Sequence, residues 1–508
     1  MPQGETKMAH KPGAKAASDR GDDTALVWFR NDLRLADHRP LTEALQEARH
    51  VLCVFVLDRK AGGAWALGGA SLWWLHHSLA ALAEAIGKAG GTLILREGDA
   101  AKIIPALASE AGAASVHCGR SHEPVLRELD RRVEKALAQH DIAFRSHRVS
   151  TLFELDTIRT QTGKVYGVYT PFARTCRGLP DPEPPLPPVK QLHAPDGKFA
   201  SDRLEDWHLL PTRPDWAGGL RDAWNPGEAG AHARMQRFLA DHLDDYGDSR
   251  NIPGNEDGTS MLSPHLRWGE LSPVQVWHAA REANGQGRAR KGSTGRSGFD
   301  TFQGEILWHE FAAYLLHHNP AMPDEPLRPA YNRLRWRHDP RGLQAWQRGQ
   351  TGVPIVDAGM RQLWHIGWMH NRVRMITASL LTKHLLVSWQ EGEAWFWDTL
   401  VDGDLATNSA SWQWVAGTGT DSQPFFRIFN PVTQGRKFDP DGAYVRRWVP
   451  ELQRLGDRWL HEPWEAPEAE LERAGIRLGD HYPRPVISLT EGRDRALAAF
   501  RNEVRAAS

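Results

Sequence analysis

Five tryptophans in the C-terminal half of the chain are the side chains best suited to unusual chemistry. They are Trp308, Trp336, Trp389, Trp412 and Trp414. The whole chain has 22 Trp but only 7 Tyr. Buried indoles usually pack as core or interface, so the excess alone indicates a large helical core. Indole rings separated by a short gap can also pass an electron from one to the next. The polar residues around these tryptophans decide between the two interpretations.

Two helical segments combine polar and apolar side chains at helical spacing. Glu305 and Trp308 are three residues apart and so share one helix face. A carboxylate beside an indole can hydrogen-bond the edge of a nucleobase while the ring packs against an opened base. Asn371 and Met375 are four apart, with Arg374 on the same side. They offer an amide for a pyrimidine carbonyl and a soft apolar contact. The alternative for both segments is a core Trp or Met beside surface polar groups.

A third candidate is the segment 258–272, which clusters hydroxyl groups ahead of a helical pattern. Thr259, Ser260 and Ser263 could offer hydroxyls while backbone N–H groups at the helix start hold a phosphate. The same residues also suit an ordinary helix cap. Likewise, the D-G-D-L run at 402–405 is typical of a turn and helix cap. For each segment, a ligand-binding site and an ordinary helix cap both stay open.

Composition narrows the class of protein. The 508 residues allow two or more domains with a large core. The net charge is −1, so a nucleic-acid partner must meet a local basic patch. Three well-separated cysteines indicate a reducing compartment and exclude a four-cysteine iron–sulfur cluster from this chain alone. We expect no metal site and no membrane span. Residues 1–24 lack the apolar core of a secretory signal and are expected to be a disordered extension.

Hydrophobic periodicity predicts the elements that must position these residues. Between 25 and 150, short apolar runs alternate with helical patterns. This alternation predicts an α/β domain with a doubly wound parallel sheet. No GxGxxG follows any of the runs, which argues against a dinucleotide bound in the usual Rossmann manner. The predicted strands are 25–29, 50–58, 91–98, 114–120 and 142–147, and the predicted helices are 36–48, 71–90, 100–112 and 125–140.

The rest of the chain changes character twice. Residues 151–228 include the proline-rich stretch 179–189 and are predicted to form an interdomain connector. From 229 to 508 the pattern is mostly helical and rich in Trp, Arg and His. We therefore predict an all-α C-terminal domain without internal repeats.

Taken together, these motifs resemble those of the DNA photolyase and cryptochrome family, from about residue 25 onward and most strongly between 300 and 450. The resemblance implies an N-terminal antenna domain and a helical domain that binds FAD, active as reduced FADH⁻. It pairs Asp402 with Arg374 beside the flavin ring. It places Asp404 at the flavin's polar edge and Asn408 opposite flavin N5. His309 stands where the family usually has Arg. The implied FAD-binding residues are Tyr246, Thr259, Ser260, Met261, Leu262, Ser263, Phe302, Glu305, His309, Arg374, Asp402, Asp404 and Asn408.

Within that family, the chain is most similar to enzymes that repair cyclobutane pyrimidine dimers, in particular the plant-cryptochrome-like bacterial class III. Asn371 and Met375 stand where (6-4) photolyases have two histidines, and Asn408 stands where plant cryptochromes carry Asp. The implied reaction sends one electron from light-excited FADH⁻ to a flipped-out dimer, whose cyclobutane ring splits before the electron returns. A blue-light receptor and a (6-4) photolyase are the alternatives. The implied catalytic residues are Glu305, Asn371, Met375, Asn408, Trp308 and Trp414.

The resemblance also implies an electron relay and partners. Trp412, Trp389 and Trp336 match the relay, ordered from flavin to solvent. The implied antenna is 5,10-methenyltetrahydrofolate, with a deazaflavin or an empty site as alternatives. A monomer in the bacterial cytoplasm, without membrane contact, is expected. The implied partner is UV-damaged DNA containing pyrimidine dimers, contacted by Arg372, Arg427, Trp308 and Trp414.

Overall fold

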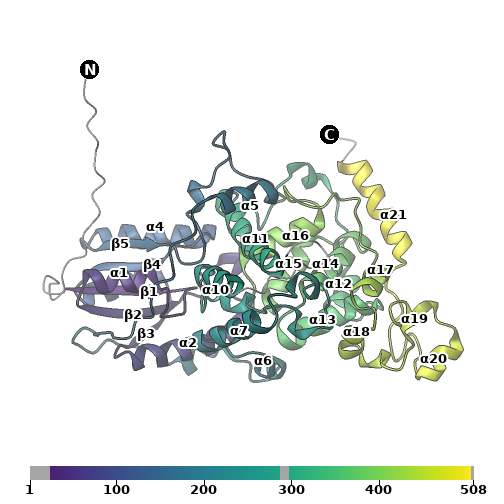
Figure 1. Ribbon diagram of the computed structural model, residues 1–508, viewed down its shortest axis with the longest axis horizontal. Helices are drawn as coiled ribbons and strands as arrows, with labels where there is room; N and C mark the ends of the chain where they lie inside the picture. The colour runs from purple at the N-terminus through teal and green to yellow at the C-terminus, as the bar shows by residue number, and fades with distance from the viewer. Residues whose placement is uncertain (1–22, 286–296, 505–508) are drawn as a thin grey trace, which may run out of the picture.

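The computed structural model describes residues 23–285 and 297–504. An α/β part built on one sheet lies beside a larger helical part, and α21 stands at the end of the molecule opposite the sheet (Figure 1). The predicted fold class, a doubly wound parallel sheet followed by an all-α domain, is confirmed. Over residues 1–22, the predicted disordered extension lies outside the described residues.

The sheet has five parallel strands in the order β3-β2-β1-β4-β5. Each strand lies within two residues of its predicted position. Its residues alternate between two apolar clusters, because successive side chains of a strand point to opposite faces. Val27 and Cys53 pack with α1 and α2 on one face, whereas Trp28 and Val54 pack with α3 and α4 on the other. The strands are β1 (Thr24–Phe29), β2 (His50–Leu57), β3 (Leu93–Glu97), β4 (Ala113–Gly119) and β5 (Ala143–His147), and the helices are α1 (Arg39–Glu47), α2 (Gly69–Lys88), α3 (Ala100–Glu110) and α4 (Pro124–Ala138).

The predicted connector is only partly extended. It contains α5 (Tyr169–Gly178) and α6 (Gly218–Ala223), while the proline-rich stretch 179–189 has no regular secondary structure. Proline cannot donate a backbone N–H and cannot continue a helix, which accounts for that stretch.

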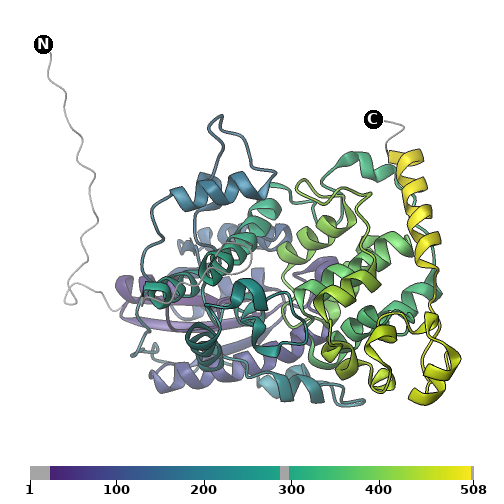
Figure 2. The same cartoon turned by 45° about the vertical axis from the view of Figure 1, so that its right-hand side comes forward.

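The helical part begins with α7, and its helices gather on the side of the molecule away from the sheet (Figure 2). Two apolar clusters are buried among them, and one of these clusters also includes residues of the connector. Its helices are α7 (Glu228–Asp241), α8 (Tyr246–Ser249), α9 (Ser263–Arg267), α10 (Pro273–Gly285), α11 (Gly298–His318), α12 (Pro340–Gln347), α13 (Pro354–Ile366), α14 (Asn371–Ser379), α15 (Trp389–Thr399), α16 (Leu405–Ala416), α17 (Pro431–Phe438), α18 (Ala443–Trp448), α19 (Asp457–Leu460), α20 (Glu468–Ala474) and α21 (Leu489–Ala499). A π-helical segment, Leu380–His384, directly follows α14 and leads towards α15.

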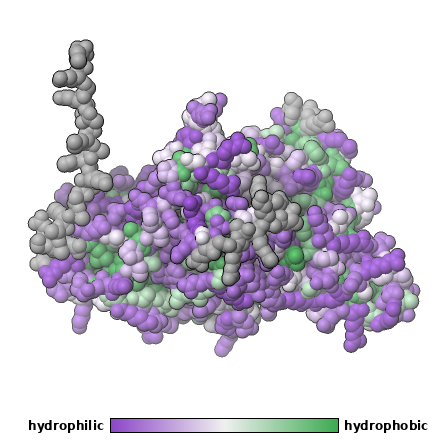
Figure 3. Space-filling model, viewed as in Figure 1, coloured by the Kyte–Doolittle hydropathy of each residue, from purple (hydrophilic) through white to green (hydrophobic). Residues whose placement is uncertain are grey.

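Hydrogen bonds between buried polar groups link the α/β part to the helical part. Glu270 accepts hydrogen bonds from the indole of Trp74 on α2 and from the backbone of Gly227, and its other oxygen lies 2.5 Å from His265. Because each buried carboxylate oxygen has a partner, this junction avoids the cost of an unpaired buried charge. The face seen in Figure 3 is mostly hydrophilic, with hydrophobic residues scattered over it. Among the described residues, no helix is both long and apolar enough to cross a membrane.

Candidate functional site

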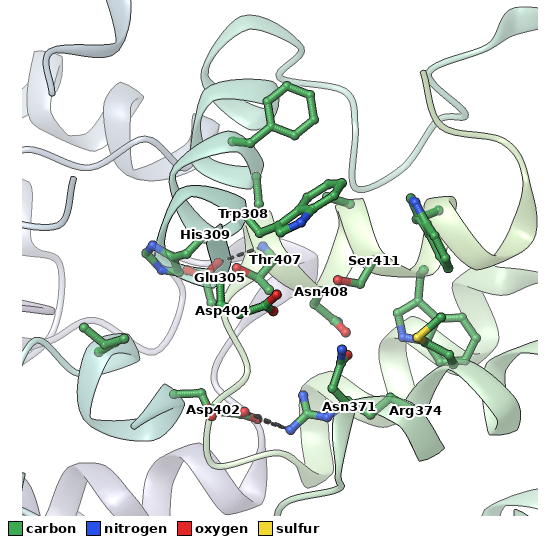
Figure 4. Close-up of a pocket in the computed structure, with 18 of the residues that line it drawn as sticks. Glu305, Trp308, His309, Asn371, Arg374, Asp402, Asp404, Thr407, Asn408 and Ser411 are labelled. Carbon is green, nitrogen blue, oxygen red and sulfur yellow. Dashed lines mark hydrogen bonds and ion pairs between the residues drawn. The ribbon is translucent and has the colours of Figure 1, made fainter. Parts of the chain in front are cut away.

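A cavity of about 550 Å³ opens among the helices of the C-terminal part. Side chains from α11, α14 and α16 face it (Figure 4). Its volume lies in the range typical of cofactor and ligand sites. The sequence-predicted residues that line it are Tyr246, Ser260, Leu262, Ser263, Phe302, Glu305, Trp308, His309, Asn371, Arg372, Arg374, Met375, Asp402, Asp404, Asn408, Trp412 and Trp414.

Helix α11 supplies one wall. The hydroxyl of Ser297 caps its start by accepting a hydrogen bond from the N–H of Asp300. Phe302, Glu305 and His309 follow at spacings of three and four, so they share the face that lines the cavity. Trp308 lies beside them with its side chain 36% exposed. An aromatic residue is thus held at the mouth of the cavity rather than in the core.

Two residues that contact this wall were not identified from the sequence. The ring of Tyr169, at the start of α5, stacks on Trp308 with 3.7 Å between centroids. Its hydroxyl donates to the backbone oxygen of Gly304 at 2.7 Å. Arg250, just after α8, lies 2.5 Å from a carboxylate oxygen of Glu305 and also lines the cavity. Neither residue has a spacing signal, because both reach the site from distant segments.

Helix α14 supplies the opposite wall. Gly367 ends α13 in the left-handed conformation, and His370 caps α14 by accepting the N–H of Arg372. Asn371, Arg374 and Met375 then line the cavity from one helix. The N-terminal end of a helix therefore presents an amide, a guanidinium and a thioether together, as the sequence spacing predicted.

An ion pair lies in the cavity floor. Arg374 and Asp402 are 2.8 Å apart, and the Asp402 side chain is only 4% exposed (Figure 4). Arg374 also donates to the backbone oxygen of Met369 at 2.7 Å. Two positions earlier on α14, Arg372 donates to Asn251 at 2.6 Å and lies over the ring of Phe438.

Asp404 unites the two interpretations that the sequence left open for its segment. Its carboxylate caps α16 by accepting the N–H of Thr407 at 2.7 Å, and it also lines the cavity. Burial alone would raise the pKa of Asp404, yet His309 and Arg267 nearby hold that pKa below its usual value. The carboxylate therefore stays ionised inside the cavity wall.

Asn408 is fixed from behind by α15. Its amide N–H donates to the backbone oxygen of Glu393 at 3.0 Å, and its side chain faces the same open space as Asn371 (Figure 4). The Glu393 side chain is buried, and burial raises its pKa well above the usual value. One of its oxygens accepts the hydroxyl of Ser409 at 2.5 Å. Burial thus disfavours a charge on Glu393 behind the neutral amide of Asn408.

The predicted phosphate segment lies only partly in the cavity. Ser260 and Ser263 line it, and the Ser263 hydroxyl accepts the indole N–H of Trp368 at 3.2 Å. Thr259 and Met261 do not line it. Met261 instead has a left-handed backbone and packs against the apolar core of the sheet.

The three relay tryptophans occupy one region, and only Trp412 lines the cavity. Trp412 and Trp389 are buried in the same apolar cluster. Gly392, one turn beyond Trp389 on α15, lies against Trp412 so closely that a Cβ there would come within 2.1 Å of the indole. The absence of a side chain at Gly392 lets α15 and α16 approach, which brings Trp389 towards Trp412.

Trp336 lies further out. The neighbouring Arg337 donates its backbone N–H to the oxygen of Leu386 at 2.8 Å, three residues before Trp389. Trp336 is partly exposed and packs against the cluster that holds Trp412 and Trp389. Trp412 and Trp389 are thus both fully buried, and of the three rings Trp336 alone reaches solvent, which agrees with its predicted place at the outer end. Their role as a relay stays a prediction.

Arg427 stands apart from the other candidates. It is exposed, does not line the cavity and donates its backbone N–H to Pro424 in the segment after α16. The predicted DNA-contacting residues thus divide into Arg372, Trp308 and Trp414 at the cavity and Arg427 outside it.

Comparisons with known proteins agree with this arrangement. The family model described as DNA photolyase matches residues 25–190, and the model described as FAD binding domain of DNA photolyase matches residues 302–502. The chain is 46% identical to a deoxyribodipyrimidine photo-lyase of Agrobacterium fabrum, covering 94% of this chain and 97% of that protein. It is 35% identical to Cryptochrome-1 of Arabidopsis thaliana, covering 93% of this chain and 69% of that protein.

Solved structures give the same result. The crystal structure of a bacterial class III photolyase from Agrobacterium tumefaciens matches with a TM-score of 0.90 and 46% identity, covering 96% of this chain and 98% of that chain. The match to the photo-lyase extends over nearly the full length of both proteins. The chain therefore belongs to the DNA photolyase and cryptochrome family.

Proposed function

We propose that this protein is a light-dependent deoxyribodipyrimidine photo-lyase that splits cyclobutane pyrimidine dimers in DNA. The observation that carries the proposal is the cavity, in which Asn371 on α14 lies across from Glu305 and Trp308 on α11 (Figure 4) and which Met375 also lines. Neither Asn371 nor Met375 can act as an acid or base, so this wall suits a reaction driven by electron transfer. Near-full-length similarity to a deoxyribodipyrimidine photo-lyase supports the same conclusion.

The polar residues of the cavity fit a bound FAD. Arg374, held by Asp402, offers a fixed guanidinium for the polar edge of an isoalloxazine. The hydroxyls of Ser260 and Ser263 line the cavity and can donate to a diphosphate, and Asp404 offers an ionised acceptor. The neutral Asn408 leaves a reduced, anionic flavin without an adjacent charged acid. When bound, FADH⁻ would absorb light and supply one electron.

The remaining wall fits two fused pyrimidines. The rings of Trp308 and Trp414 give apolar surfaces, and Met375 adds a soft contact. Asn371 can hydrogen-bond a pyrimidine carbonyl, and Glu305 can bond a base edge. Photolyases are among the enzymes known to turn a nucleotide out of the duplex, and a damaged pair costs less to open. The residues of this chain therefore bind and orient the lesion.

Arginines at the cavity suit the backbone of DNA. Arg250 and Arg372 line the cavity, and Arg427 lies exposed outside it. Arg372 is held by Asn251, which fixes its direction. A chain with a net charge of −1 must gather its phosphate contacts locally, and these residues supply them. We expect binding to weaken as salt rises.

The resemblance to class III enzymes supports a folate antenna, 5,10-methenyltetrahydrofolate, bound outside this cavity. It also supports a monomer that acts on chromosomal DNA in the cytoplasm of a bacterium. Mass analysis of the chromophores extracted from the purified protein tests the antenna directly. Recovery of a deazaflavin, or of FAD alone, would contradict it.

A repair assay tests the function. Reduced, FAD-loaded protein is illuminated with an oligonucleotide that contains a defined thymine dimer, and restored thymines are counted by chromatography. We expect full repair by the parent protein, and strongly reduced repair with normal FAD content in Trp308→Ala. Trp364→Ala is the matched control, since Trp364 is exposed and does not line the cavity. Intact FAD with no restored thymine would favour a receptor, and repair of a (6-4) lesion instead would favour that enzyme class.

A further inference from the structure

Four titratable side chains that the proposed reaction does not use meet at the C-terminal end of α11. His317 and His318 are the last two residues of that helix. Asp156 comes from the short 3₁₀ turn Leu155–Thr157 in the connector. His122 comes from the loop between β4 and α4. The sheet, the connector and the helical part thus each contribute to one cluster.

The geometry of three of these residues fits a metal ion. One ligand atom each from Asp156, His317 and His318 lies within 4.8 Å of the others. Nε2 of His317 is 2.9 Å from Oδ1 of Asp156. Nε2 of His318 is buried and has no hydrogen-bond partner among the described residues. Bond lengths of about 2.1 Å in a tetrahedral zinc site place ligands roughly 3.4 Å apart, so small side-chain rotations close the set.

The surroundings hold the cluster in place. Nδ1 of His122 is 3.4 Å from Nδ1 of His317, so Nε2 of His317, on the side of Asp156, is the nitrogen that can coordinate. A ligating histidine commonly has its second ring nitrogen fixed by a neighbour in this way. Further back on α11, Glu310 accepts the backbone N–H groups of Leu152 and Phe153. That contact lays the connector along the helix and brings Asp156 to His317.

Asp156 also has a cationic neighbour. Arg159, 3.7 Å from Asp156, competes for the carboxylate and limits the affinity.

We propose that Asp156, His317 and His318 bind a divalent transition-metal ion, Zn²⁺ above all. Two imidazoles and one carboxylate suit zinc, nickel or copper better than magnesium or calcium. The Asp156 side chain is 72% exposed, so the ion reaches the site from solvent and water completes its coordination. The ion ties the connector to α11, whose other residues include Glu305 and Trp308. This site does not depend on the proposed repair function.

Metal titration of the tag-free, full-length protein tests the site. The protein is stripped with a chelator, and Zn²⁺ binding is measured by competition with a chromophoric chelator. We expect one ion per chain for the parent. Asp156→Asn and His318→Gln should each weaken binding at least about tenfold. His140→Gln is the matched control, because His140 is an exposed histidine outside the cluster and should leave the affinity unchanged.

A second measurement separates a metal site from a purely structural cluster. Added Zn²⁺ should raise the melting temperature of the parent and of His140→Gln, because a ligand stabilises the state that binds it. It should not raise that of Asp156→Asn. Without metal, Asp156→Asn should melt near the parent, since Asp156 is exposed. Equal zinc affinity in all four proteins, or no stoichiometric binding by the parent, would overturn the proposal.

Discussion

Two of the cavities formed by residues 23–285 and 297–504 differ in what their polar side chains do. The cavity among the helices is about 550 Å³, whereas the one at the carboxyl ends of β1 and β4 is about 70 Å³. In open parallel sheets, ligands usually bind at the carboxyl ends of the strands where the strand order reverses. Here β1 and β4 are the strands at that point. The larger cavity nevertheless lies elsewhere.

The charged groups that directly follow β1 are already paired. Arg30, just after β1, lies 2.6 Å from Asp130 on α4, and Asp32 lies 3.1 Å from His38. In the helical cavity, by contrast, Asn408 and Arg374 have protein partners on one side only and face open space on the other. A residue type alone therefore does not mark a binding site. What matters is whether the surrounding fold uses up its hydrogen-bonding capacity.

The largest expected difference between the two regions concerns light-driven reduction of bound FAD. In Trp412→Phe we expect photoreduction of oxidised FAD to fall to background, because a phenyl ring is far harder to oxidise than an indole. Repair by chemically reduced protein should continue. Trp73→Phe, equally buried but in α2 of the sheet part, is the control and should photoreduce normally. Transient absorption under blue light measures this, and normal photoreduction in Trp412→Phe would refute the relay.

Breaking the ion pair of the helical cavity should have the next largest effect. Asp402→Ala leaves Arg374 without its partner in a largely enclosed site. We expect this to weaken the free energy of FAD binding by about 3 kcal/mol. We expect FAD affinity to fall on the order of 10²-fold. The FAD-to-protein ratio and a fluorescence titration measure it.

The control for that variant is an exposed pair in the sheet part. Arg59 and Glu97 are 2.7 Å apart with side chains 42% and 40% exposed. Glu97→Gln should change the free energy of unfolding by less than about 1 kcal/mol and leave FAD binding intact. Similar FAD loss in both variants would mean that the cavity pair has no special role.

Sequence periodicity predicted the elements well because their patterns are local. Strands of the buried sheet read as continuous apolar runs, and each was placed within two residues. Asn371, Arg374 and Met375 were grouped correctly because helical spacing puts them on one face. The same argument put Glu305 and Trp308 on one face of a helix, and both line the cavity from α11.

Contacts between distant segments were not predicted, because no local sequence pattern marks them. Arg250 and Tyr169 meet α11 through the fold and have no fixed spacing from Glu305 or Trp308. Asp156 and His317 are 161 residues apart, so no metal-binding motif could mark them. Two interpretations kept separate for Asp404, cap and cavity residue, apply together. Local physics fixes which residues share a face, and packing decides which faces meet.

The stability of the helical part should depend on pH through the buried side chain of His370. Burial lowers the pKa of His370 to about 3, so the folded state takes up this proton at lower pH than the unfolded state does. The free energy of unfolding should therefore decrease as pH falls from 6.5 towards 3, by about 2 kcal/mol at pH 5. In His370→Asn, which keeps a capping acceptor, that decrease should be smaller. Denaturant titrations at each pH measure it, with His140→Asn as the control. An unchanged slope would show that His370 is charged in the folded state.

The smallest effect is expected at the carboxyl ends of the strands. It tests whether the paired charges there only stabilise the fold or belong to a binding site. Asp130→Asn keeps an acceptor for Arg30 but removes the opposite charge, and Arg30 also donates to the backbone oxygen of Gly119. We expect the free energy of unfolding to fall by about 1 kcal/mol. FAD content and repair should stay at parent levels, because Asp130 does not line the helical cavity. Chemical denaturation and the repair assay measure both. A loss of repair with unchanged stability would mean that the paired charges at the sheet serve the chemistry after all, and that the division between the two regions is wrong.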